Sequence, residues 1–339
     1  MTRRYAVLGA AVTLAVVACG GSTDRSTTTA GPAPTLTEAP GATTTSQAPA
    51  STTTEAPADA ITFVGADGVE SEITDTSRIV SLNGDITEVL FALGLGDRVV
   101  AVDVTTTYPA ETEDLPKVGF GQQLAAEGVL AFEPTLVIGD QLVAPAEGIE
   151  QLRVAGVPVA IITTQTTLDG AAAKIRDIAA ITGAVDVGET LALQVTDDIA
   201  AAMELAGGAT EQRRVAFVYT RGPEQLFLFG AGTVTQAMIE GANAIDAVAD
   251  GGLSGFVPLT PEALVAAAPD VLIAPASGVG ALGGPEGVLA LPGVAQTPAG
   301  EAGPGALLVY DDGLFLNLGP RTGEALHQLV VDLYPELAS

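Results

Sequence analysis

The chain has 339 residues, with 41 Asp and Glu against 13 Lys and Arg, which gives a formal net charge of −28 at pH 7. A surface this acidic repels phosphate backbones and argues against nucleic acid as a partner. The chain also has one histidine and one cysteine, so it offers little for acid–base catalysis and cannot form an internal disulfide.

The first 19 residues have the features of an export signal. Arg3 and Arg4 precede an apolar run that is too short to span a membrane, and small residues surround Cys19. Residues 16–20 resemble a bacterial lipobox, in which the cysteine becomes the lipidated first residue of the mature protein. We predict a lipoprotein signal peptide over 1–19 and an exported protein that is lipid-anchored to the outer face of the cytoplasmic membrane. The alternative is that Cys19 is an ordinary small residue.

Residues 20–60 are rich in Thr, Pro, Ala and Ser. Such a composition cannot bury a hydrophobic core, so we predict a disordered tether over this segment. A tether suits an anchored protein because it separates the folded part from the membrane.

Strand and helix patterns alternate from residue 78 onward, and the first set predicts an N-terminal α/β lobe over residues 75–166. RIVSL predicts a strand, and residues 83–103 predict a capped helix, a glycine stop and a second strand. Three further apolar runs predict the remaining strands of this lobe, at residues 117–120, 135–139 and 157–162.

A helical connection is predicted over residues 167–210. Residues 168–184 are rich in alanine with apolar residues at helical spacing, and a second helix is predicted from Val187 to Ala206. The strand pattern RRVAFVY then begins a C-terminal α/β lobe over residues 211–339. The further elements predicted for this lobe are a helix at 233–242, a helix and strand at 260–274, a strand at 306–310 and a final helix from Thr322. The fold class is therefore α/β, with two lobes around central, parallel-type sheets on either side of the connection.

A helix–proline–strand unit occurs twice in the chain. EGVLAFEPTLVIG (127–139) is matched 135 residues later by EALVAAAPDVLIA (262–274). In each copy apolar residues at helical spacing precede a proline, and a continuous apolar run suited to a buried parallel strand follows it. Chance is one explanation, because such junctions are common in α/β proteins. The other is a pair of similar lobes, since the offset suits one modest domain per copy.

From Arg78 to the C-terminus the chain resembles one known family. The similar segments are RIVSLNGDITEVLFALGLGDRVVAVD, VGFGQQLAAEGVLAFEPTLVIG, LTPEALVAAAPDVLIA and LGPRT. They resemble the periplasmic-binding proteins of ABC importers for iron complexes and cobalamin, and most of all the haemin-binding lipoproteins. The resemblance implies two α/β lobes joined by a long rigid helix, with the ligand held in the cleft between the lobes. It also implies transport without catalysis, with an ABC permease dimer and its ATPase as partners.

The resemblance gives the repeated unit a role. In this family a glutamate on each lobe docks with arginines of the two membrane subunits, and Glu127 and Glu262 occupy the matching positions. A roughly two-fold permease is matched by a pseudo-two-fold binding protein, and we expect each carboxylate on an exposed helix N-terminus. The alternative is that both residues are ordinary acids at helix N-termini.

The segment VYTRGPE places Tyr219 and Arg221 at the carboxyl end of the second lobe's first strand. Ligand contacts gather at such strand ends, and side chains two apart on a strand point the same way. Tyrosine is an axial ligand of ferric haem iron, and a neighbouring guanidinium stabilises the phenolate. The pair resembles the ligand pair of haemin-binding lipoproteins, so we predict that Tyr219 coordinates the iron of a captured haem. The alternative is a tyrosine that ends a strand beside a solvated arginine.

The first lobe departs from the haemin-binding pattern at Phe120. Members of this group often have Tyr or His in the segment that reads VGFGQQL here, and phenylalanine cannot coordinate iron, although it can stack on a porphyrin face. Three possibilities stay open. Tyr219 is the one protein ligand of the iron, or Tyr108, Gln122 or Gln123 replaces the missing ligand, or the transported molecule is a ferric siderophore or cobalamin.

Tyr108 and Arg321 are further candidate ligand contacts, whereas His327 is not. Tyr108 follows a Thr run and precedes Pro109, a position that is also typical of a turn residue. Arg321, in LGPRT, is placed before a helix where it could bind a ligand carboxylate or cap a neighbouring strand. His327 belongs to an amphipathic terminal helix and is predicted to be partly buried or solvated rather than a ligand.

Two other classes of protein fit the sequence less well. An enzyme is disfavoured because the chain has no glycine-rich phosphate loop with its lysine, no HExxH and no Gly-x-Ser-x-Gly. A surface adhesion or structural lipoprotein would explain the tether but not the paired lobes.

Overall fold

The structure, a computed structural model, describes residues 60–338. The predicted signal peptide, the lipidation site Cys19 and the tether up to residue 59 lie outside the described residues. The described part begins with an antiparallel hairpin of β1 (Ile61–Val64) and β2 (Glu70–Ile73), which the sequence analysis did not predict. Ile73 is buried in the main hydrophobic cluster, so this hairpin packs against the rest of the described protein.

The first lobe is built on a four-stranded parallel sheet with the strand order β4-β3-β5-β6. Its elements in chain order are β3 (Ile79–Ser81), α1 (Gly84–Ala92), η1 (Gly96–Arg98), β4 (Val99–Val102), η2 (Ala110–Thr112), η3 (Gly121–Gln123), α2 (Ala126–Leu130), β5 (Leu136–Asp140), α3 (Ala146–Val154) and β6 (Val159–Ile162). The predicted strand at 117–120 is wrong. Lys117 forms only an isolated bridge with Val102, and Gly119 then turns the chain with a left-handed φ of 93°.

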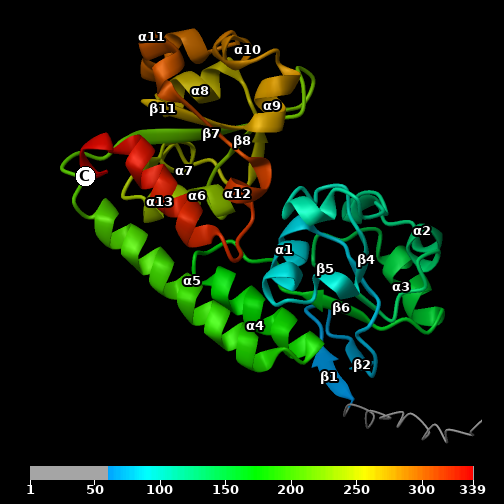
Figure 1. The fold of residues 1–339 in the computed structure, drawn as a ribbon. Helices are drawn as coiled ribbons and strands as arrows, with labels where there is room; N and C mark the ends of the chain where they lie inside the picture. Colours follow the sequence, from blue (N-terminus) through cyan, green and yellow to red (C-terminus); the bar gives the residue numbers. More distant parts are fainter. Residues whose placement is uncertain (1–59, 339) are drawn as a thin grey trace, which may run out of the picture. The chain divides into compact units, whose positions relative to one another are not determined.

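Two packed helices, α4 (Gly170–Thr182) and α5 (Val185–Ala206), connect the lobes (Figure 1). Gly183 ends α4 in the left-handed conformation, with a φ of 77°. The helices approach closely at Gly188, where an added Cβ would lie 2.2 Å from the Cβ of Ala179. α4 packs against α1 and β6 of the first lobe, whereas α5 packs along the last helix of the second lobe. The connection is therefore a pair of helices in contact with both lobes rather than one uninterrupted helix.

The second lobe contains a mixed sheet with the order β10-β8-β7-β11-β12, and β9 pairs with the start of β7. Its strands are β7 (Arg214–Thr220), β8 (Leu226–Phe229), β9 (Ile245–Asp246), β10 (Phe256–Pro258), β11 (Val271–Pro275) and β12 (Leu307–Tyr310). β7, β9, β11 and β12 are parallel, whereas β8 and β10 form an antiparallel edge. The predicted α/β class is confirmed, and the antiparallel edge is an addition to it.

The helices of the second lobe lie on both sides of this sheet (Figure 1). They are α6 (Val234–Gly241), α7 (Ala247–Asp250), α8 (Pro261–Ala267), α9 (Ala276–Ala281), α10 (Pro285–Leu289), η4 (Val294–Gln296), α11 (Pro298–Ala302), η5 (Gly303–Ala306), α12 (Asp312–Leu316), α13 (Thr322–Leu333) and η6 (Pro335–Leu337). The helices predicted from Thr233, from residue 260 and from Thr322 correspond to α6, α8 and α13.

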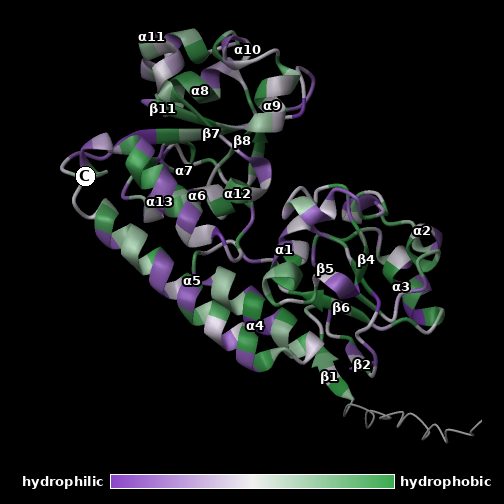
Figure 2. Cartoon of the chain, viewed as in Figure 1, coloured by the Kyte–Doolittle hydropathy of each residue, from purple (hydrophilic) through white to green (hydrophobic). Residues whose placement is uncertain are grey.

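Neighbouring residues of the strands are buried on opposite faces of each sheet. In the first lobe Ile138 and its neighbour Val137 belong to two different hydrophobic clusters, and in the second lobe Phe217 and Val218 are divided in the same way. One hydrophobic cluster includes buried residues of both lobes and of the two connecting helices. In Figure 2 the strands are mainly hydrophobic, whereas the helices combine hydrophobic and hydrophilic residues. Burial of this apolar surface is the main stabilising contribution to such a fold.

The two copies of the helix–proline–strand unit occupy equivalent places in the lobes. β5 pairs with β3 on one side and β6 on the other, and β11 pairs in the same way with β7 and β12. In both copies the residue before the proline has a left-handed φ, 46° at Glu133 and 45° at Ala268. An extended backbone is the usual conformation before proline, so the two units share an uncommon turn as well as a sequence pattern.

An arginine at the start of each lobe's first strand supports this turn. The Arg78 guanidinium donates hydrogen bonds of 2.6 and 2.9 Å to the carbonyl oxygens of Phe132 and Glu133. The Arg214 guanidinium donates two of 3.0 and 3.3 Å to the carbonyl oxygen of Ala267. Because carbonyl groups near helix ends lack partners within the helix, the two arginines stabilise the same feature in both lobes.

Candidate functional site

A cavity of about 440 Å³ is lined by residues of both lobes. The first lobe contributes residues from the loops after β3, β4 and β5 and from the segment 120–123, and the second lobe contributes the end of β7 and the loop that follows. Ligand sites of open α/β sheets occur at such carboxyl ends of strands. The cavity is therefore where the strand order predicts a binding site.

The second lobe's wall of the cavity contains Tyr219 and Arg221. Tyr219 is half-buried near the end of β7, and the exposed Arg221 follows that strand. The Arg221 Nε donates a hydrogen bond of 2.5 Å to the Tyr219 hydroxyl oxygen. The guanidinium carbon lies 5.7 Å from the Tyr219 ring centroid and 5.4 Å from that of Phe120. Three residues singled out in the sequence, from two lobes, are thus brought together.

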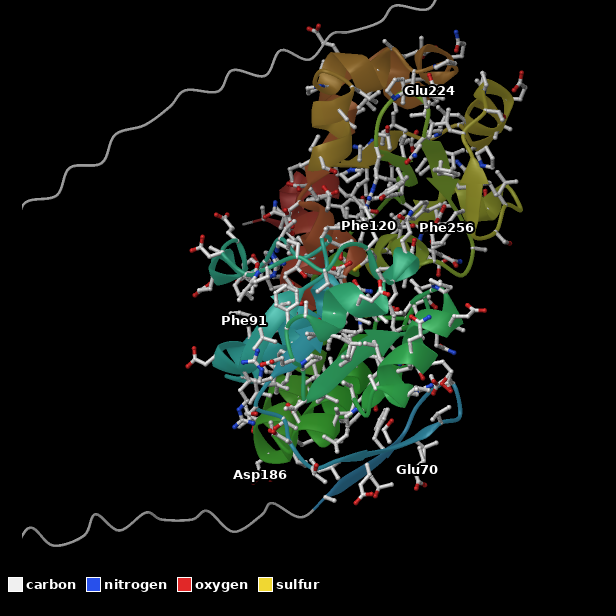
Figure 3. All side chains as sticks on the ribbon, turned by 90° about the vertical axis from the view of Figure 1, so that its right-hand side faces the viewer. Glu70, Phe91, Phe120, Asp186, Glu224 and Phe256 are labelled. Atoms are coloured by element: carbon white, nitrogen blue, oxygen red, sulfur yellow. The ribbon has the colours of Figure 1, made fainter. Side chains whose placement is uncertain are left out.

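A row of aromatic side chains continues from Tyr219 along the sheet. Strand pairing sets Phe229 opposite Phe217 and opposite Phe256. The Phe229 ring centroid lies 5.2 Å from that of Tyr219 and 4.4 Å from that of Phe256, which is 64% exposed. Figure 3 shows Phe120 and Phe256 at the level where the two lobes meet. The Tyr219 ring therefore belongs to an aromatic face of the sheet, while its hydroxyl is bound to Arg221.

The opposite wall contains Phe120, Gln122 and Gln123, and all three line the cavity. The Phe120 ring is 40% exposed, and both glutamines are exposed. Gly121 allows this segment to lie against the end of β3, because an added Cβ would lie 2.5 Å from the carbonyl oxygen of Leu82. The wall thus offers an aromatic ring and two neutral amides.

Two buried carboxylates beneath this wall were not found in the sequence analysis. Asp103 directly follows β4, and its Oδ1 accepts hydrogen bonds from the Thr105 amide and hydroxyl, of 3.0 and 2.6 Å. Burial raises the pKa of the Asp103 carboxyl above its ordinary value of 3.8, while hydrogen bonds from Thr105 and from the Gly121 amide oppose the rise. Asp103 thus fixes the start of the loop after β4 through its hydrogen bonds with Thr105.

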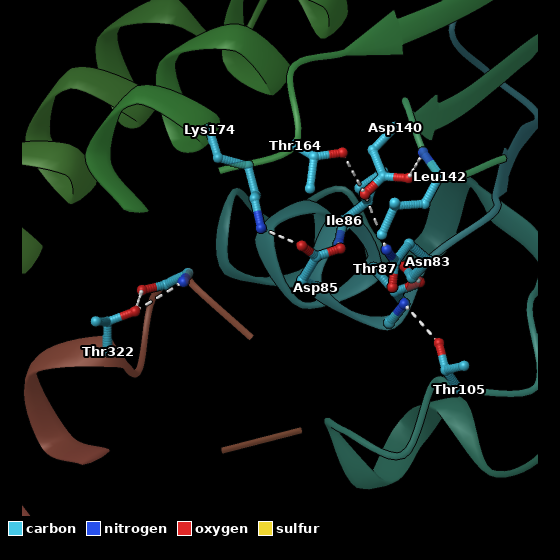
Figure 4. Close-up of polar contacts among 12 residues, drawn as sticks. Asn83, Asp85, Ile86, Thr87, Thr105, Asp140, Leu142, Thr164, Lys174 and Thr322 are labelled. Atoms are coloured by element: carbon cyan, nitrogen blue, oxygen red, sulfur yellow. Dashed lines mark hydrogen bonds and ion pairs between the residues drawn. The ribbon is translucent and has the colours of Figure 1, made fainter. Parts of the chain in front are cut away.

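Asp140 ends β5 and connects three loops (Figure 4). Its oxygens accept hydrogen bonds from the Leu142 amide (3.0 Å), the Thr164 hydroxyl (3.2 Å) and the Asn83 side-chain amide (3.3 Å). Burial is the main cause that raises the pKa of the Asp140 carboxyl, and the nearby negative charge of Asp85 adds to the rise. The sequence signal for both carboxylates was an aspartate at the end of an apolar strand, in AVD and in IGD.

Asp85 is itself paired with Lys174 of α4 in a buried ion pair (Figure 4). Their side chains are 11% and 4% exposed, so this pair fastens α1 to α4 inside the protein. Within residues 60–338 no group of three His, Cys, Asp or Glu side chains is arranged to hold a metal ion. The aspartates act through hydrogen bonds and ion pairs that shape the cavity wall.

Tyr108 and Arg321 do not line the cavity. The Arg321 guanidinium pairs with the carboxylate of Glu88, with Nε to Oε1 at 2.9 Å and Nη2 to Oε2 at 2.8 Å, and lies 3.6 Å above the Tyr108 ring centroid. These contacts join the start of α13 to the first lobe. Neither of the two roles considered for Arg321, binding a ligand carboxylate or capping a strand, describes this contact.

The remaining predicted residues lie outside the cavity. Glu127 and Glu262 are exposed in the first turns of α2 and α8, in the two equivalent units. His327 is exposed on α13. In the part of the chain that the structure describes, no helix has the length and apolar character needed to cross a membrane.

The chain belongs to the Periplasmic binding protein family, which it matches over residues 79–304. Proteins of this family and its structural neighbours are substrate-binding components of transport systems, and those of ABC importers work with a permease and an ATPase. The family has two α/β lobes, in agreement with the sheets described above.

Several solved structures of haem-binding proteins resemble this chain. The periplasmic heme-binding protein RhuT from Roseiflexus sp. RS-1, in apo form, is 45% identical, covers 78% of this chain and 100% of its own, and has a TM-score of 0.75. The heme-binding protein HmuT is 33% identical over 84% of this chain and 93% of its own, with a TM-score of 0.77. BhuT in complex with two hemes is 35% identical over 77% and 98%, with a TM-score of 0.70.

Curated relatives give a less specific result. An uncharacterized ABC transporter substrate-binding lipoprotein, YvrC of Bacillus subtilis (strain 168), is 28% identical over 77% of this chain and 81% of its own length. A vitamin B12-binding protein of Vibrio campbellii (strain ATCC BAA-1116) is 34% identical, but the match covers only 38% of this chain and 46% of that protein.

Proposed function

We propose that this protein captures haem outside the cell and delivers it to an ABC importer. The observation that carries the proposal is the position of Tyr219 in the cavity wall, with Arg221 bound to its hydroxyl and Phe120 on the facing wall. A phenolate oxygen is a suitable ligand for ferric haem iron, and the aromatic rings beside it suit the face of a planar macrocycle. The protein then acts by binding alone, without catalysing a reaction.

The similar solved structures support haem as the ligand. RhuT, BhuT and HmuT are each named as heme-binding proteins. Solved variants of HmuT replace by alanine a tyrosine, an arginine two positions after it, or a histidine. Tyr219 and Arg221 have the same spacing. In this chain the first lobe presents Phe120 at the cavity, so we infer that Tyr219 is the one protein ligand of the iron, with Gln122, Gln123 and Phe120 as contacts.

Cobalamin is the second candidate ligand. A ferric siderophore is a further candidate, and only the fold supports it. Vitamin B12-binding proteins are among the curated relatives, although each match covers less than half of either chain. The first lobe's wall also favours a ligand that carries neutral amides, because it presents two glutamines above buried carboxylates. None of the described first-lobe residues that line the cavity is cationic. A corrinoid has such amides at its edge.

The proposed partners are an ABC permease dimer and its ATPase. Glu127 and Glu262 are exposed in equivalent units of the two lobes, which supports a role in docking to a roughly two-fold permease. We further propose that residues 1–19 direct export, that Cys19 carries the lipid anchor, and that residues 20–60 tether the lobes to the outer face of the cytoplasmic membrane. The relative YvrC is named as a lipoprotein.

A three-ligand titration tests the proposal. The full-length chain is incubated separately with haemin, a ferric siderophore and cyanocobalamin, and both absorbance and thermal unfolding are recorded. Haemin should stabilise the protein, by about 2.7 kcal/mol at a hundredfold excess over Kd, while the other two leave it unchanged. Stabilisation by cyanocobalamin or by the siderophore, with none by haemin, would transfer the function to that ligand.

A further inference from the structure

An ion pair joins the two lobes outside the cavity. Arg321 immediately precedes α13 in the second lobe, and Glu88 lies on α1 in the first, 233 positions away in sequence. Both carboxylate oxygens of Glu88 accept hydrogen bonds from the guanidinium. The side chains are 17% and 5% exposed, so the pair is largely shielded from water. Removal of one partner of such a pair strongly destabilises the folded protein, because the other charge is left buried without a partner.

The loop after β4 extends this contact to the cavity. Tyr108 in this loop covers the Arg321 guanidinium at 3.6 Å. Thr107 lies beside the second lobe, since an added Cβ on Gly313 of α12 would lie 3.4 Å from its hydroxyl oxygen. Asp103 and Thr105, at the start of the same loop, line the cavity. The contact between the lobes and the first lobe's cavity wall therefore share one short segment.

Helix α1 is also fixed to the connection between the lobes. Asp85 lies three residues before Glu88, on the same side of the helix, and forms the buried pair with Lys174 of α4. The helix that carries Glu88 is thus held by ion pairs to α4 and to the second lobe. A displacement of Arg321 would therefore act on α1, which is a fixed element and not a flexible segment.

We propose that Arg321, acting through Glu88 and Tyr108, is a positioning residue that fixes the two lobes at this edge and sets the separation of the cavity walls. The lobes then move about this edge, and the ligand passes on the side of Phe120, Arg221 and Gln225, which are exposed. The claim that Arg321 sets the separation of the lobes rests on the structure alone. Only its consequence for haem rests on the proposed function.

A distance measurement in the ligand-free protein tests the proposal. Cys19 is the sole cysteine, so spin labels can be attached to Val154→Cys and Val265→Cys in the full-length chain with Cys19→Ser. These positions are 86% and 40% exposed, one in each lobe. The parent should give one narrow distance distribution, and Arg321→Gln a broader one.

Arg176→Gln is the matched control, because Arg176 also forms a bidentate pair, with Glu189, but on the exposed surface of the connecting helices. It should leave the distribution unchanged. Tyr108→Leu keeps the ion pair and should broaden the distribution less than Arg321→Gln does, so it decides the matter if Arg321→Gln does not fold. A parent-like distribution in Arg321→Gln overturns the proposal, as does a parent-like distribution in Tyr108→Leu if Arg321→Gln does not fold, or equal broadening in the control.

Haem release provides the second readout. Arg321→Gln loaded with haemin should transfer it to apomyoglobin about tenfold faster than the parent, which corresponds to about 1.4 kcal/mol, with an unchanged absorption spectrum because Tyr219 is untouched. An unchanged transfer rate in a variant with broadened distances would contradict the claim that wall separation controls binding. If the parent binds no haemin, the proposed function fails, while the distances still test the contact between the lobes.

Discussion

The Arg221 guanidinium carbon lies 5.4 Å from the ring centroid of Phe120, so a second-lobe side chain reaches the facing wall of the cavity. The same guanidinium binds the Tyr219 hydroxyl through its Nε. Arg221 therefore contacts the proposed iron ligand and the aromatic ring opposite it. The proposed function therefore predicts that Arg221 affects haem affinity as well as the environment of the phenol.

Replacement of Arg221 by alanine should weaken haemin binding about tenfold or more. In the haem complex the guanidinium would stabilise the iron-bound phenolate of Tyr219, and a hydrogen bond from a charged group contributes about 1.5–3 kcal/mol. Absorbance titration of Arg221→Ala measures the effect. Arg213→Ala is the control, because Arg213 is exposed just before β7, at the opposite end of that strand. Equal affinities of the parent and Arg221→Ala would remove Arg221 from the site.

Phe120→His should add a second iron ligand to the haem complex. The ring position lines the cavity opposite Tyr219, and imidazole is a common haem ligand. The absorption spectrum should change from a high-spin type in the parent to a low-spin, six-coordinate type in the variant. Phe91→His introduces a histidine on α1 at a position that does not line the cavity and should leave the spectrum unchanged. A parent-like spectrum for Phe120→His would show that the iron is not held between these two walls.

Glu127→Ala and Glu262→Ala should leave haemin affinity intact yet reduce uptake, with the double variant worse than either alone. Single exposed ion pairs contribute only about 0.2–1 kcal/mol, so each change should have a modest effect on its own. Uptake is measured in cells that lack the native copy and express each variant.

Glu147→Ala is the control for docking, because Glu147 is also exposed in the first turn of a helix, α3, but lies outside the repeated units. A loss of haemin affinity in either single docking variant would place these carboxylates in the binding site. Normal uptake by the double variant would exclude them from docking.

The buried aspartates should make stability depend on pH in a definite direction. Burial raises the pKa of the Asp103 and Asp140 carboxyls in the folded protein above the ordinary 3.8. The folded state then binds more protons than the unfolded state, so the stabilisation is full below pH 3.8 and is lost as the pH rises through the raised pKa values.

Asp103→Asn and Asp140→Asn should therefore flatten the dependence of unfolding free energy on pH just above 3.8, measured by urea denaturation at a series of pH values. Asp197→Asn, an exposed position on α5, is the control for loss of one negative charge. The same slope in the parent and in both buried-site variants would contradict the pKa shifts.

The sequence predicted most of the fold and side chains on both walls of the cavity, Tyr219 and Arg221 on one and Phe120, Gln122 and Gln123 on the other. The alternation of apolar runs and helical spacing identified β3, β4, β5, β6, β7, β11 and β12, because strands and helices differ in periodicity over a few residues. Tyr219 and Arg221 could be selected because their strand and its carboxyl end were visible in the sequence. The segment 117–120 was assigned wrongly, since two glycines nearby favour a turn over a strand.

The missed features depend on contacts between distant residues. Asp140 holds Asn83, 57 positions away, and Arg321 binds Glu88 across 233 positions. No local pattern distinguishes Glu88 from any other glutamate in a helix. The arginine that supports each repeated unit was missed for the same reason, because its carbonyl partners lie more than 50 positions further along the chain.

The absorption spectrum of the ferric haem complex, compared between the parent and Tyr219→Phe, tests the central claim most directly. The parent should show charge-transfer absorption of a phenolate-ligated, high-spin iron, and Tyr219→Phe should lose those bands. Its fold should persist, because the change removes one hydroxyl from a half-buried side chain near the end of β7 and leaves the ring in place. Haem bound by Tyr219→Phe with the parent's spectrum would contradict the account, since the iron would then have another ligand.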